Sequence, residues 1–300
     1  MNLYIIPILY DEECYPAQLN FLEKINIMDH ENEYISTEDS EEVWKHTSKW
    51  RQFQIITLKL KYVNSSIKDI IGINDIQNII FPEDVERILL SNVFIGSESA
   101  NISLNKTQRK FYNRVIQIHN FVDEPPVDSV ARDLLDCTDY ESMKLHFRPK
   151  PKMRMTWRLH NISSESDYGV FSGMLKGQNR PEYLLLVEDK CPGYGGALRS
   201  ERQLSGEMLL AAYNRAELSL KDQEVFGIIM KGDGIRFYRC IFSEDYLRDI
   251  FNDKWPQEEV EIFRYPPDNE RSFSISHPQQ RETIIRILCA IREHLEEVIA

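Results

Sequence analysis

Hydrophobic residues recur at helical spacing along several parts of the chain. In residues 279–299, apolar side chains return every three or four positions from Ile284 to Val298, which is the pattern of a long helix with one buried face. Residues 106–118 and 125–137 show the same spacing, and the paired prolines at 125 and 126 mark a helix start. Further helices are predicted at 69–80, 82–91 and 201–215.

Other segments have the apolar run or the alternation of a β-strand. Residues 183–187 form a continuous apolar run typical of a buried strand, whereas residues 54–63 alternate apolar and polar positions. The sequence Lys-Gly-Asp-Gly at 231–234 predicts a hairpin turn between two strands. The remaining predictions are strands at 1–9, 154–159 and 168–175, a turn at 161–166, and hairpin strands at 225–230 and 235–241.

The order of these elements predicts a mixed α/β protein. After about residue 105 it runs helix, three strands, helix, two strands and then helices, which indicates a mixed sheet flanked by helices on both sides. We therefore expect one domain at 106–300. Residues 1–105 are rich in Ile, Asn, Asp and Glu, carry no chemical motif, and are expected to form a smaller α+β module of unknown role.

Charge is unevenly distributed along the chain. The 300 residues carry a net charge of −12, with a pI near 5.2. This balance argues against tight, sequence-independent binding of nucleic acid by the molecule as a whole, because such binding depends on neutralising phosphates. Residues 144–154, however, contain five lysines and arginines and no acid. That segment is either a solvated entry into a strand or an edge that faces phosphate.

The cysteines and the N-terminus favour an intracellular protein, in the cytoplasm or the nucleus. The five cysteines are odd in number and far apart, and none has the spacing of a zinc site, which favours a reducing compartment. The first ten residues are apolar but lack a basic start, so we expect a strand and not a signal peptide. No apolar run reaches about 18 residues, and no membrane span is expected.

The predicted strand at 183–187 ends in three charged residues, of which Glu188 and Lys190 are two apart and are expected to project from one face. Asp167 stands in the turn at the start of the preceding strand, and pairing of the two strands would bring its carboxylate to the same end of the sheet. Glu124, at the start of the helix that precedes the strands of the sheet, is a candidate third acid. Converging carboxylates favour Mg²⁺ (or Mn²⁺), and a nearby lysine can position a nucleophile.

Across residues 120–240 this arrangement resembles the PD-(D/E)xK nuclease superfamily, which has the restriction-endonuclease-like fold. Carried over position by position, Asp167 would be the first acid, Glu188 the second acid and Lys190 the lysine. Gln203 matches a glutamine or glutamate that often lies on the helix after the motif strand. The segments 124–135, 166–170, 187–190 and 203–212 are also similar to nuclease-fold domains of fungal proteins, including Crinkler-type effectors.

The resemblance implies a nuclease that depends on Mg²⁺ or Mn²⁺. Asp167, Glu188 and Glu124 would hold the metal, and Lys190 and Gln203 would complete the catalytic site. The implied substrate is nucleic acid, with DNA favoured over RNA. The alternative is an inactive nuclease fold that serves as an interaction module or effector, binding nucleic acid or, through the acidic N-terminal half, a protein.

The same residues also have purely structural interpretations. Glu188 and Lys190 could form a surface ion pair, and Glu124 could be a partner of the helix dipole. Glu207, one turn after Gln203 on the same helix face, could be a structural acid.

Overall fold

The computed structural model describes residues 44–72, 76–83, 85, 89–90, 95, 104–120, 125–172, 181–191, 197–268 and 270–299. All of them belong to one compact unit that spans 41–300. The strand expected at 1–9, part of the helix expected at 82–91 and the candidate acid Glu124 lie outside the described residues.

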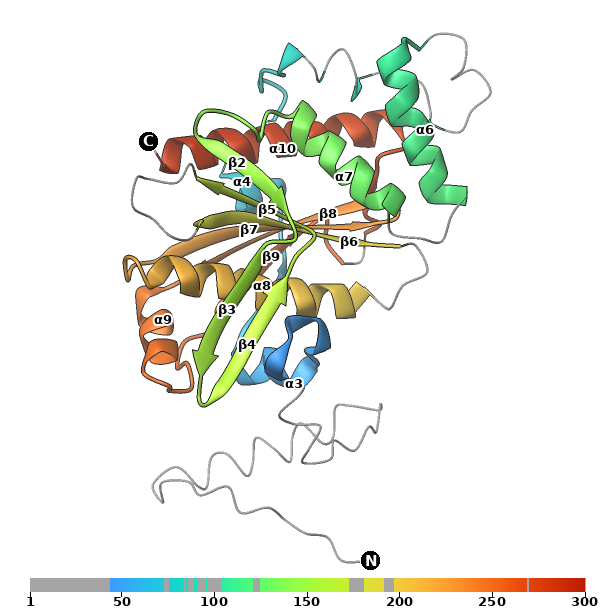
Figure 1. The fold of residues 1–300 in the computed structure, drawn as a ribbon. Helices are drawn as coiled ribbons and strands as arrows, with labels where there is room; N and C mark the ends of the chain where they lie inside the picture. Colours follow the sequence, from blue (N-terminus) through green and yellow to red (C-terminus); the bar gives the residue numbers. More distant parts are fainter. Residues whose placement is uncertain are drawn as a thin grey trace, which may run out of the picture. The chain divides into compact units, whose positions relative to one another are not determined.

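Most strands of this unit form one mixed sheet in the order β1-β9-β8-β7-β6-β5-β2, and the short β10 also pairs with β8 (Figure 1). The pairs β6–β7 and β1–β9 are parallel, and the other neighbours are antiparallel. In chain order the strands of this sheet are β1 (Leu60–Asn64), β2 (Leu145–Pro149), β5 (Tyr168–Ser172), β6 (Tyr183–Lys190), β7 (Gln223–Lys231), β8 (Gly234–Phe242), β9 (Val260–Tyr265) and β10 (Phe273–Ser274).

Helices cover both faces of the sheet (Figure 1). One face carries α7 (Pro125–Cys137), α10 (Pro278–Val298) and α4 (Ile67–Ile71), and α6 (Lys106–Asn120) packs against α7. The other face carries α8 (Ala197–Ala216), α9 (Glu244–Phe251) and α3 (Gln52–Thr57). The short 3-10 helix η2 (Thr47–Lys49) and a separate hairpin, β3 (Lys152–Trp157) and β4 (His160–Glu165), pack on α8. Helix α8 also provides the crossover that parallel neighbours such as β6 and β7 require.

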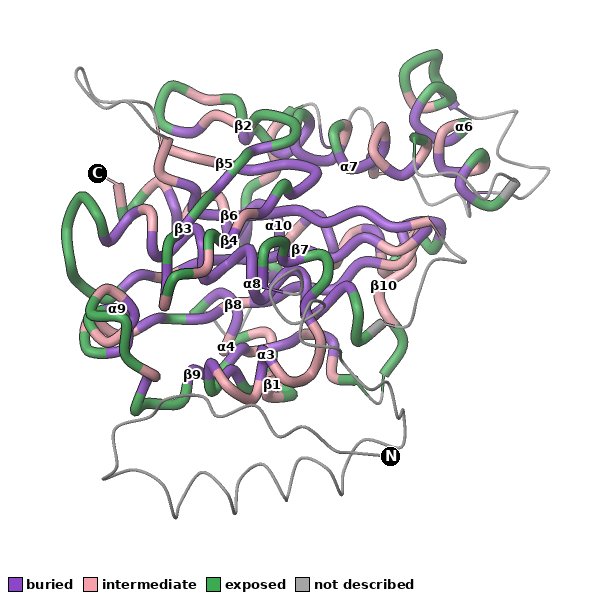
Figure 2. Tube along the Cα trace, turned by 60° about the horizontal axis from the view of Figure 1, so that its bottom comes forward, coloured by how far each residue is buried: buried purple, intermediate pink, exposed green. Residues whose placement is uncertain are grey.

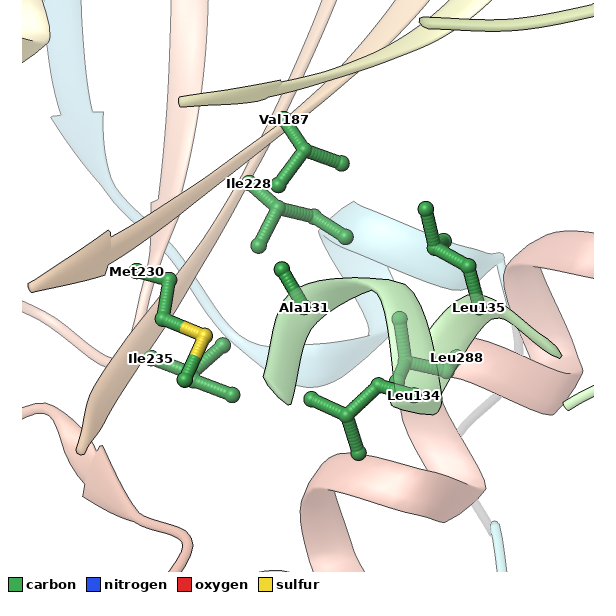
Figure 3. Close-up of a pocket in the computed structure, with 8 residues that line it drawn as sticks. All are labelled: Ala131, Leu134, Leu135, Val187, Ile228, Met230, Ile235 and Leu288. Atoms are coloured by element: carbon green, nitrogen blue, oxygen red, sulfur yellow. The ribbon is translucent and has the colours of Figure 1, made fainter. Parts of the chain in front are cut away.

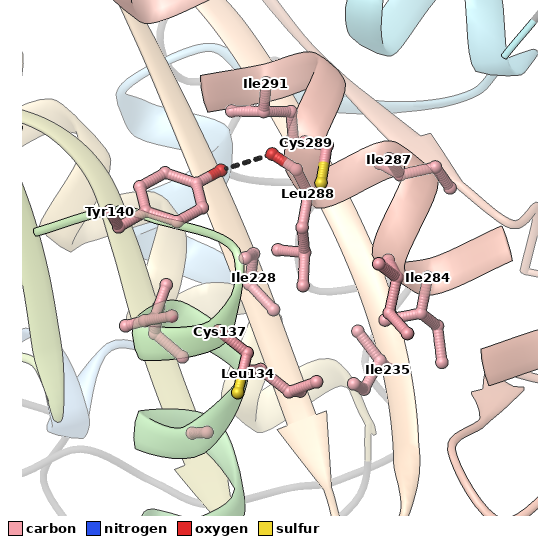
Figure 4. Close-up of a cluster of buried hydrophobic side chains, with 14 of the residues drawn as sticks. Leu134, Cys137, Tyr140, Ile228, Ile235, Ile284, Ile287, Leu288, Cys289 and Ile291 are labelled. Carbon is pink, nitrogen blue, oxygen red and sulfur yellow. Dashed lines mark hydrogen bonds between the residues drawn. The ribbon is translucent and has the colours of Figure 1, made fainter. Parts of the chain in front are cut away.

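The core between the sheet, α7 and α10 is apolar (Figure 4). Leu134, Ile228 and Leu288 meet there, and the hydroxyl of Tyr140 donates a hydrogen bond of 2.8 Å to the Leu288 carbonyl. A gap of about 10 Å³ remains among eight apolar side chains (Figure 3). A space of that size is at the limit for a single water, which would also need polar partners, so this gap is a packing defect and not a binding site.

Helix α8 is buried along most of its length (Figure 2). Two glycines allow this close packing. A Cβ on Gly206 of α8 would come within 2.7 Å of the Thr47 side chain, and a Cβ on Gly227 of β7 would come within 2.8 Å of Leu204. Any larger residue at these positions would push the η2 segment away from α8, or α8 away from the sheet.

The mixed α/β class, with a large mixed sheet flanked by helices, is confirmed. The helices expected at 106–118, 125–137, 201–215 and 279–299 are present, as are the strands expected at 154–159, 183–187, 225–230 and 235–241, with ends shifted by a few residues. The strand expected at 168–175 is described as far as Ser172.

Two predictions before residue 105 are wrong. Residues 54–63 are not a single strand, because α3 ends at Thr57 and Lys59 adopts a φ of 51° before β1 begins. The helix expected at 69–80 ends at Gly72, whose φ of 77° gives the left-handed C-terminal cap that glycine favours.

One further prediction between α7 and β5 is wrong. The turn expected at 161–166 is strand β4, because the chain reverses earlier, at Arg158 and Leu159, both of which have positive φ angles. The cation-rich segment contains strand β2, which pairs with β5. Since β2 is the last strand in the sheet order, this segment lies at an edge of the sheet, which is one of the two expectations.

The boundary expected at residue 105 falls inside the described unit. Strand β1 pairs in parallel with β9, with Leu60 opposite Val260 and Asn64 opposite Arg264. The described residues before 105 therefore complete the same sheet and the same core as the later residues.

A buried ion pair ties α8 to β8 and β9. Glu201 of α8 is 1% exposed, and its Oε1 accepts hydrogen bonds from Nη1 of Arg264 at 2.9 Å and from the hydroxyl of Tyr238 at 2.8 Å. Two partners compensate for the removal of this carboxylate from water.

We expect Glu201→Ala to lower the free energy of unfolding by about 3–5 kcal/mol, because the buried Arg264 would lose its buried carboxylate and keep, of the described residues, only Asn64 and the half-exposed Asp268. Urea denaturation followed by circular dichroism measures the change. Glu259→Ala is the matched control, since Glu259 pairs with Lys61 at 2.9 Å on the surface, and its loss should be under about 1 kcal/mol. Equal losses in the two variants would contradict the role given to Glu201.

Candidate functional site

Asp167 lies beside the end of β6, as the sequence predicts. Its backbone N–H donates to the Val187 carbonyl at 3.1 Å, which extends the pairing of β5 with β6 by one residue. Its Oδ2 accepts a hydrogen bond of 2.6 Å from the backbone N–H of Asp189. The side chain is thereby fixed at the strand end that carries Glu188 and Lys190.

Glu188 and Lys190 are buried together, and the Lys190 ammonium donates to Oε1 of Glu188. Burial raises the pKa of Glu188 well above its usual range, and the negative charges of Glu207 and Asp167 add to this effect, while Lys190 opposes it. Oε2 of Glu188 has no hydrogen-bond partner within the described part of the chain. The interpretation of the two residues as a surface ion pair is therefore wrong, because both are in the interior.

Helix α8 brings Gln203 and Glu207 to the same place. Nε2 of Gln203 donates to Oε1 of Glu207 at 3.0 Å, and the hydroxyl of Ser166 donates to Oε2 at 2.8 Å. Burial raises the pKa of Glu207 to about 7, although the two hydrogen bonds favour its charged form. Glu207 thus belongs to the same electrostatic cluster as Asp167 and Glu188. Its spacing of four residues from Gln203 was the only signal of this in the sequence.

Asp189 is a buried acid that the sequence did not assign to the site. It is 1% exposed, and neither of its carboxylate oxygens has a hydrogen-bond donor within the described residues. Burial raises its pKa well above the usual range, and the nearby charges of Asp167 and of Asp128, on α7, raise it further. Since alternate side chains of a strand point to opposite faces, Asp189 leaves β6 on the side away from Glu188.

Lys150 is a second lysine at this site. Its φ of 50° lies in the left-handed region, its N–H donates to the Asp167 carbonyl at 2.9 Å, and its ammonium donates to Oδ1 of Asp167. Burial disfavours its charged form, but the hydrogen bond and charge of Asp167, with the charges of Asp128 and Glu188, outweigh burial and raise the pKa of Lys150. Sequence reasoning did not single out Lys150 within the cation-rich segment, because only the backbone conformation directs it toward these acids.

The site holds more negative than positive groups. If every group on the Glu188 side were ionised, Asp167, Glu188 and Glu207 would carry three negative charges against two positive charges, those of Lys150 and Lys190. Carboxylate oxygens without donors, together with this excess of charge, are the features that suit a hard divalent cation.

The lysines already contact one oxygen each of Asp167 and Glu188. Within the described residues, no three His, Cys, Asp or Glu side chains are grouped closely enough to hold a metal ion. Glu124, the expected third acid, lies outside those residues. Metal binding at Asp167 and Glu188 would therefore require Lys150 to move away from Asp167, which its half-exposed side chain allows.

We expect the protein without metal to lose stability as the pH rises from about 4.5 to about 7. Glu207 has a higher pKa in the folded protein than the ordinary value of 4.5, so in this window the unfolded chain loses a proton that the folded protein keeps. The full shift corresponds to at most about 3 kcal/mol. Urea denaturation in EDTA at several pH values measures the slope, and Glu207→Gln should flatten it. An unchanged slope in that variant would contradict the assignment.

The chain matches no protein-family model, and no curated protein is significantly similar to it. No helix in the described part of the chain is both long and apolar enough to cross a membrane.

Proposed function

We propose that this protein is a metal-dependent nuclease that hydrolyses phosphodiester bonds of DNA or RNA. The observation that carries the proposal is the buried Glu188–Lys190 pair at the end of a central strand, with Asp167 hydrogen-bonded to the same strand end. This constellation supports the resemblance to the PD-(D/E)xK superfamily and its restriction-endonuclease-like fold. Gln203 reaches the cluster through Glu207, which adds a fourth matching position.

Asp167 and Glu188 are the proposed ligands of Mg²⁺ or Mn²⁺, and Glu124 is the proposed third ligand. A bound divalent ion supplies Lewis-acid stabilisation of the phosphate and lowers the pKa of a bound water. The carboxylates fit this role because Oε2 of Glu188 has no described donor and Asp167 is held rigidly by the Asp189 N–H.

Lys190 is the proposed group that orients the attacking water and stabilises negative charge as it develops on the phosphate. In the hydrolysis, the water oxygen forms a new bond to phosphorus, and the bond from phosphorus to the leaving oxygen breaks. The water loses a proton and the leaving oxygen gains one. Gln203 holds Glu207 and is a positioning residue. DNA remains the favoured substrate over RNA as part of this proposal.

One observation favours the alternative, an inactive nuclease fold that binds a protein or nucleic-acid partner. The two lysines already contact the two proposed metal ligands, so the acids are partly neutralised without metal. In an interaction module, these ion pairs could simply stabilise the fold. Metal-dependent turnover decides between the two functions.

Cleavage is expected to fall by at least about 100-fold in both Glu188→Gln and Lys190→Met, because each removes a group that acts on the reacting phosphate. Methionine is preferred to alanine because Lys190 is buried and a cavity would weaken the fold. Labelled DNA and RNA, each with Mg²⁺, Mn²⁺ or EDTA, provide the assay. The matched surface controls Glu259→Gln and Lys61→Met should cleave normally. Full cleavage by Lys190→Met, with thermal melts showing a folded protein, would refute the proposal.

Lys150→Gln is expected to bind Mg²⁺ about tenfold more tightly than the unmodified protein, equivalent to ~1.4 kcal/mol. The substitution removes the ammonium that competes with the metal for Asp167. Isothermal titration calorimetry measures the affinity. Lys152→Gln is the matched control, because Lys152 carries the same charge two residues away and pairs with Glu165 on the surface. Weaker or equal binding in Lys150→Gln would show that Lys150 does not compete.

A further inference from the structure

A polar pocket of about 230 Å³ adjoins the candidate site. Its walls come from three parts of the chain: His46 and Ser48 on one side, Lys152 and Arg154 of β3 with Ser164 of β4 on another, and Gln203 of α8. Gln203 also donates a hydrogen bond to Glu207, so this one side chain contacts both the pocket and the acidic cluster.

The wall that carries His46 is fixed in place by specific contacts. His46 pairs with Ser163 of β4 as an isolated bridge, and its Nδ1 lies 2.7 Å from the Ser163 hydroxyl. That hydroxyl donates to the Lys45 carbonyl at 3.0 Å, so Nδ1 of His46 is the donor to the hydroxyl. Gly206 of α8 provides the room in which the neighbouring Thr47 packs.

The pocket carries a positive charge. Lys152 and Arg154 contribute two cations, and Glu165 contributes one acid. Lys152 pairs with Glu165 at 3.2 Å, but both side chains are about half exposed or more, so the pair is weak and exchangeable. The guanidinium of Arg154 has no carboxylate partner among the described residues. The hydroxyl of Ser164, itself 6% exposed, has no hydrogen-bond partner there either.

This pocket differs from the acidic cluster in the sign of its charge. The cluster would attract a metal ion, whereas the pocket would attract an anion, and the two share Gln203 as a boundary. The volume is below the range of roughly 300–1,000 Å³ in which whole drug-sized molecules are buried. A pocket of this size suits one phosphate with its sugar, and not an enclosed base.

We propose that this pocket binds a backbone phosphate of the nucleic-acid strand whose neighbouring phosphodiester lies at Asp167, Glu188 and Lys190. This inference rests on the proposed function. Arg154 supplies the principal ion pair to the phosphate, and Lys152 is released from Glu165 to supply a second. The cation-rich segment thus contributes to substrate binding through its last two cations, whereas Lys150 contacts Asp167 when no metal is bound. A globally acidic chain can bind a strand in this way, because the positive potential is local.

The test is binding of a short fluorescent single-stranded DNA in EDTA, where no metal supports cleavage, followed by fluorescence anisotropy at several salt concentrations. Arg154→Gln/Lys152→Gln should weaken binding about tenfold. It should also reduce the slope of log affinity against log salt by about 0.7, the value for one phosphate of a single strand. Arg109→Gln/Lys110→Gln on α6 removes the same total charge from exposed positions and should leave both quantities unchanged.

A variant that is expected to raise the DNA affinity rules out misfolding as the cause of the changes. Glu165→Gln removes the acid from the pocket and should tighten binding several-fold, which damage to the fold cannot produce. Equal loss of DNA affinity in the pocket and α6 variants would show that only total charge matters. Unchanged DNA affinity in the pocket variant would show that these two cations do not bind the strand. Either result overturns the proposal.

Inorganic phosphate distinguishes a strand site from a free-phosphate site. If inorganic phosphate stabilises the protein in thermal melts while the DNA does not bind, the pocket takes free phosphate and the strand assignment is wrong. The two proposals also fail separately. Metal-dependent cleavage that is unaffected in Arg154→Gln/Lys152→Gln at low substrate concentration overturns only the pocket, whereas strand binding at the pocket without any cleavage overturns only the nuclease.

Discussion

The burial of ionisable groups at the end of β6 is the constraint on which this structure depends. Glu188, Asp189 and Lys190 are the last three residues of β6, directly after its apolar part, and remain in the interior. An unpaired charge in such a place costs several kcal/mol, so neighbouring elements must supply partners or the acids must take up protons. Here both occur: Lys190 pairs with Glu188, the Asp189 N–H binds Asp167, and burial raises the pKa values of Glu188 and Asp189.

Much of this site could be predicted from the sequence because it depends on local rules. Alternation along a strand puts Glu188 and Lys190 on one face, and the expected pairing of consecutive strands puts Asp167 beside them. The position of Lys150 could not be predicted, since it follows from a left-handed backbone angle and not from residue type. The burial of Glu207 was equally hidden, because helical spacing relates it to Gln203 but does not show which face of α8 meets the sheet.

The fold was predictable in class but not in connectivity. Helices with clear spacing were found, whereas the pairing of β1 with β9 joins residues about 200 positions apart, and no local pattern specifies such a contact. Strand β4 was missed for another reason. It is largely polar, with Asn161, Ser163 and Glu165 pointing away from the buried side, and only its hairpin partner and α8 make it a strand. Tertiary contacts therefore overrode a weak local signal.

The acidic cluster and the positively charged pocket lie next to each other because α8 contributes residues to both. One turn of this helix carries Glu207 into the acid cluster, while Gln203 and the room at Gly206 shape the adjacent pocket with its exposed cations. A structure selected for stability alone would favour replacing the buried acids with apolar residues of similar volume, since buried ion pairs seldom stabilise more than such replacements do. Retaining them beside a pocket of opposite charge is what a site for an anionic substrate and a cation would require. Local conflicts of this kind are expected where function, and not stability, determines the residues.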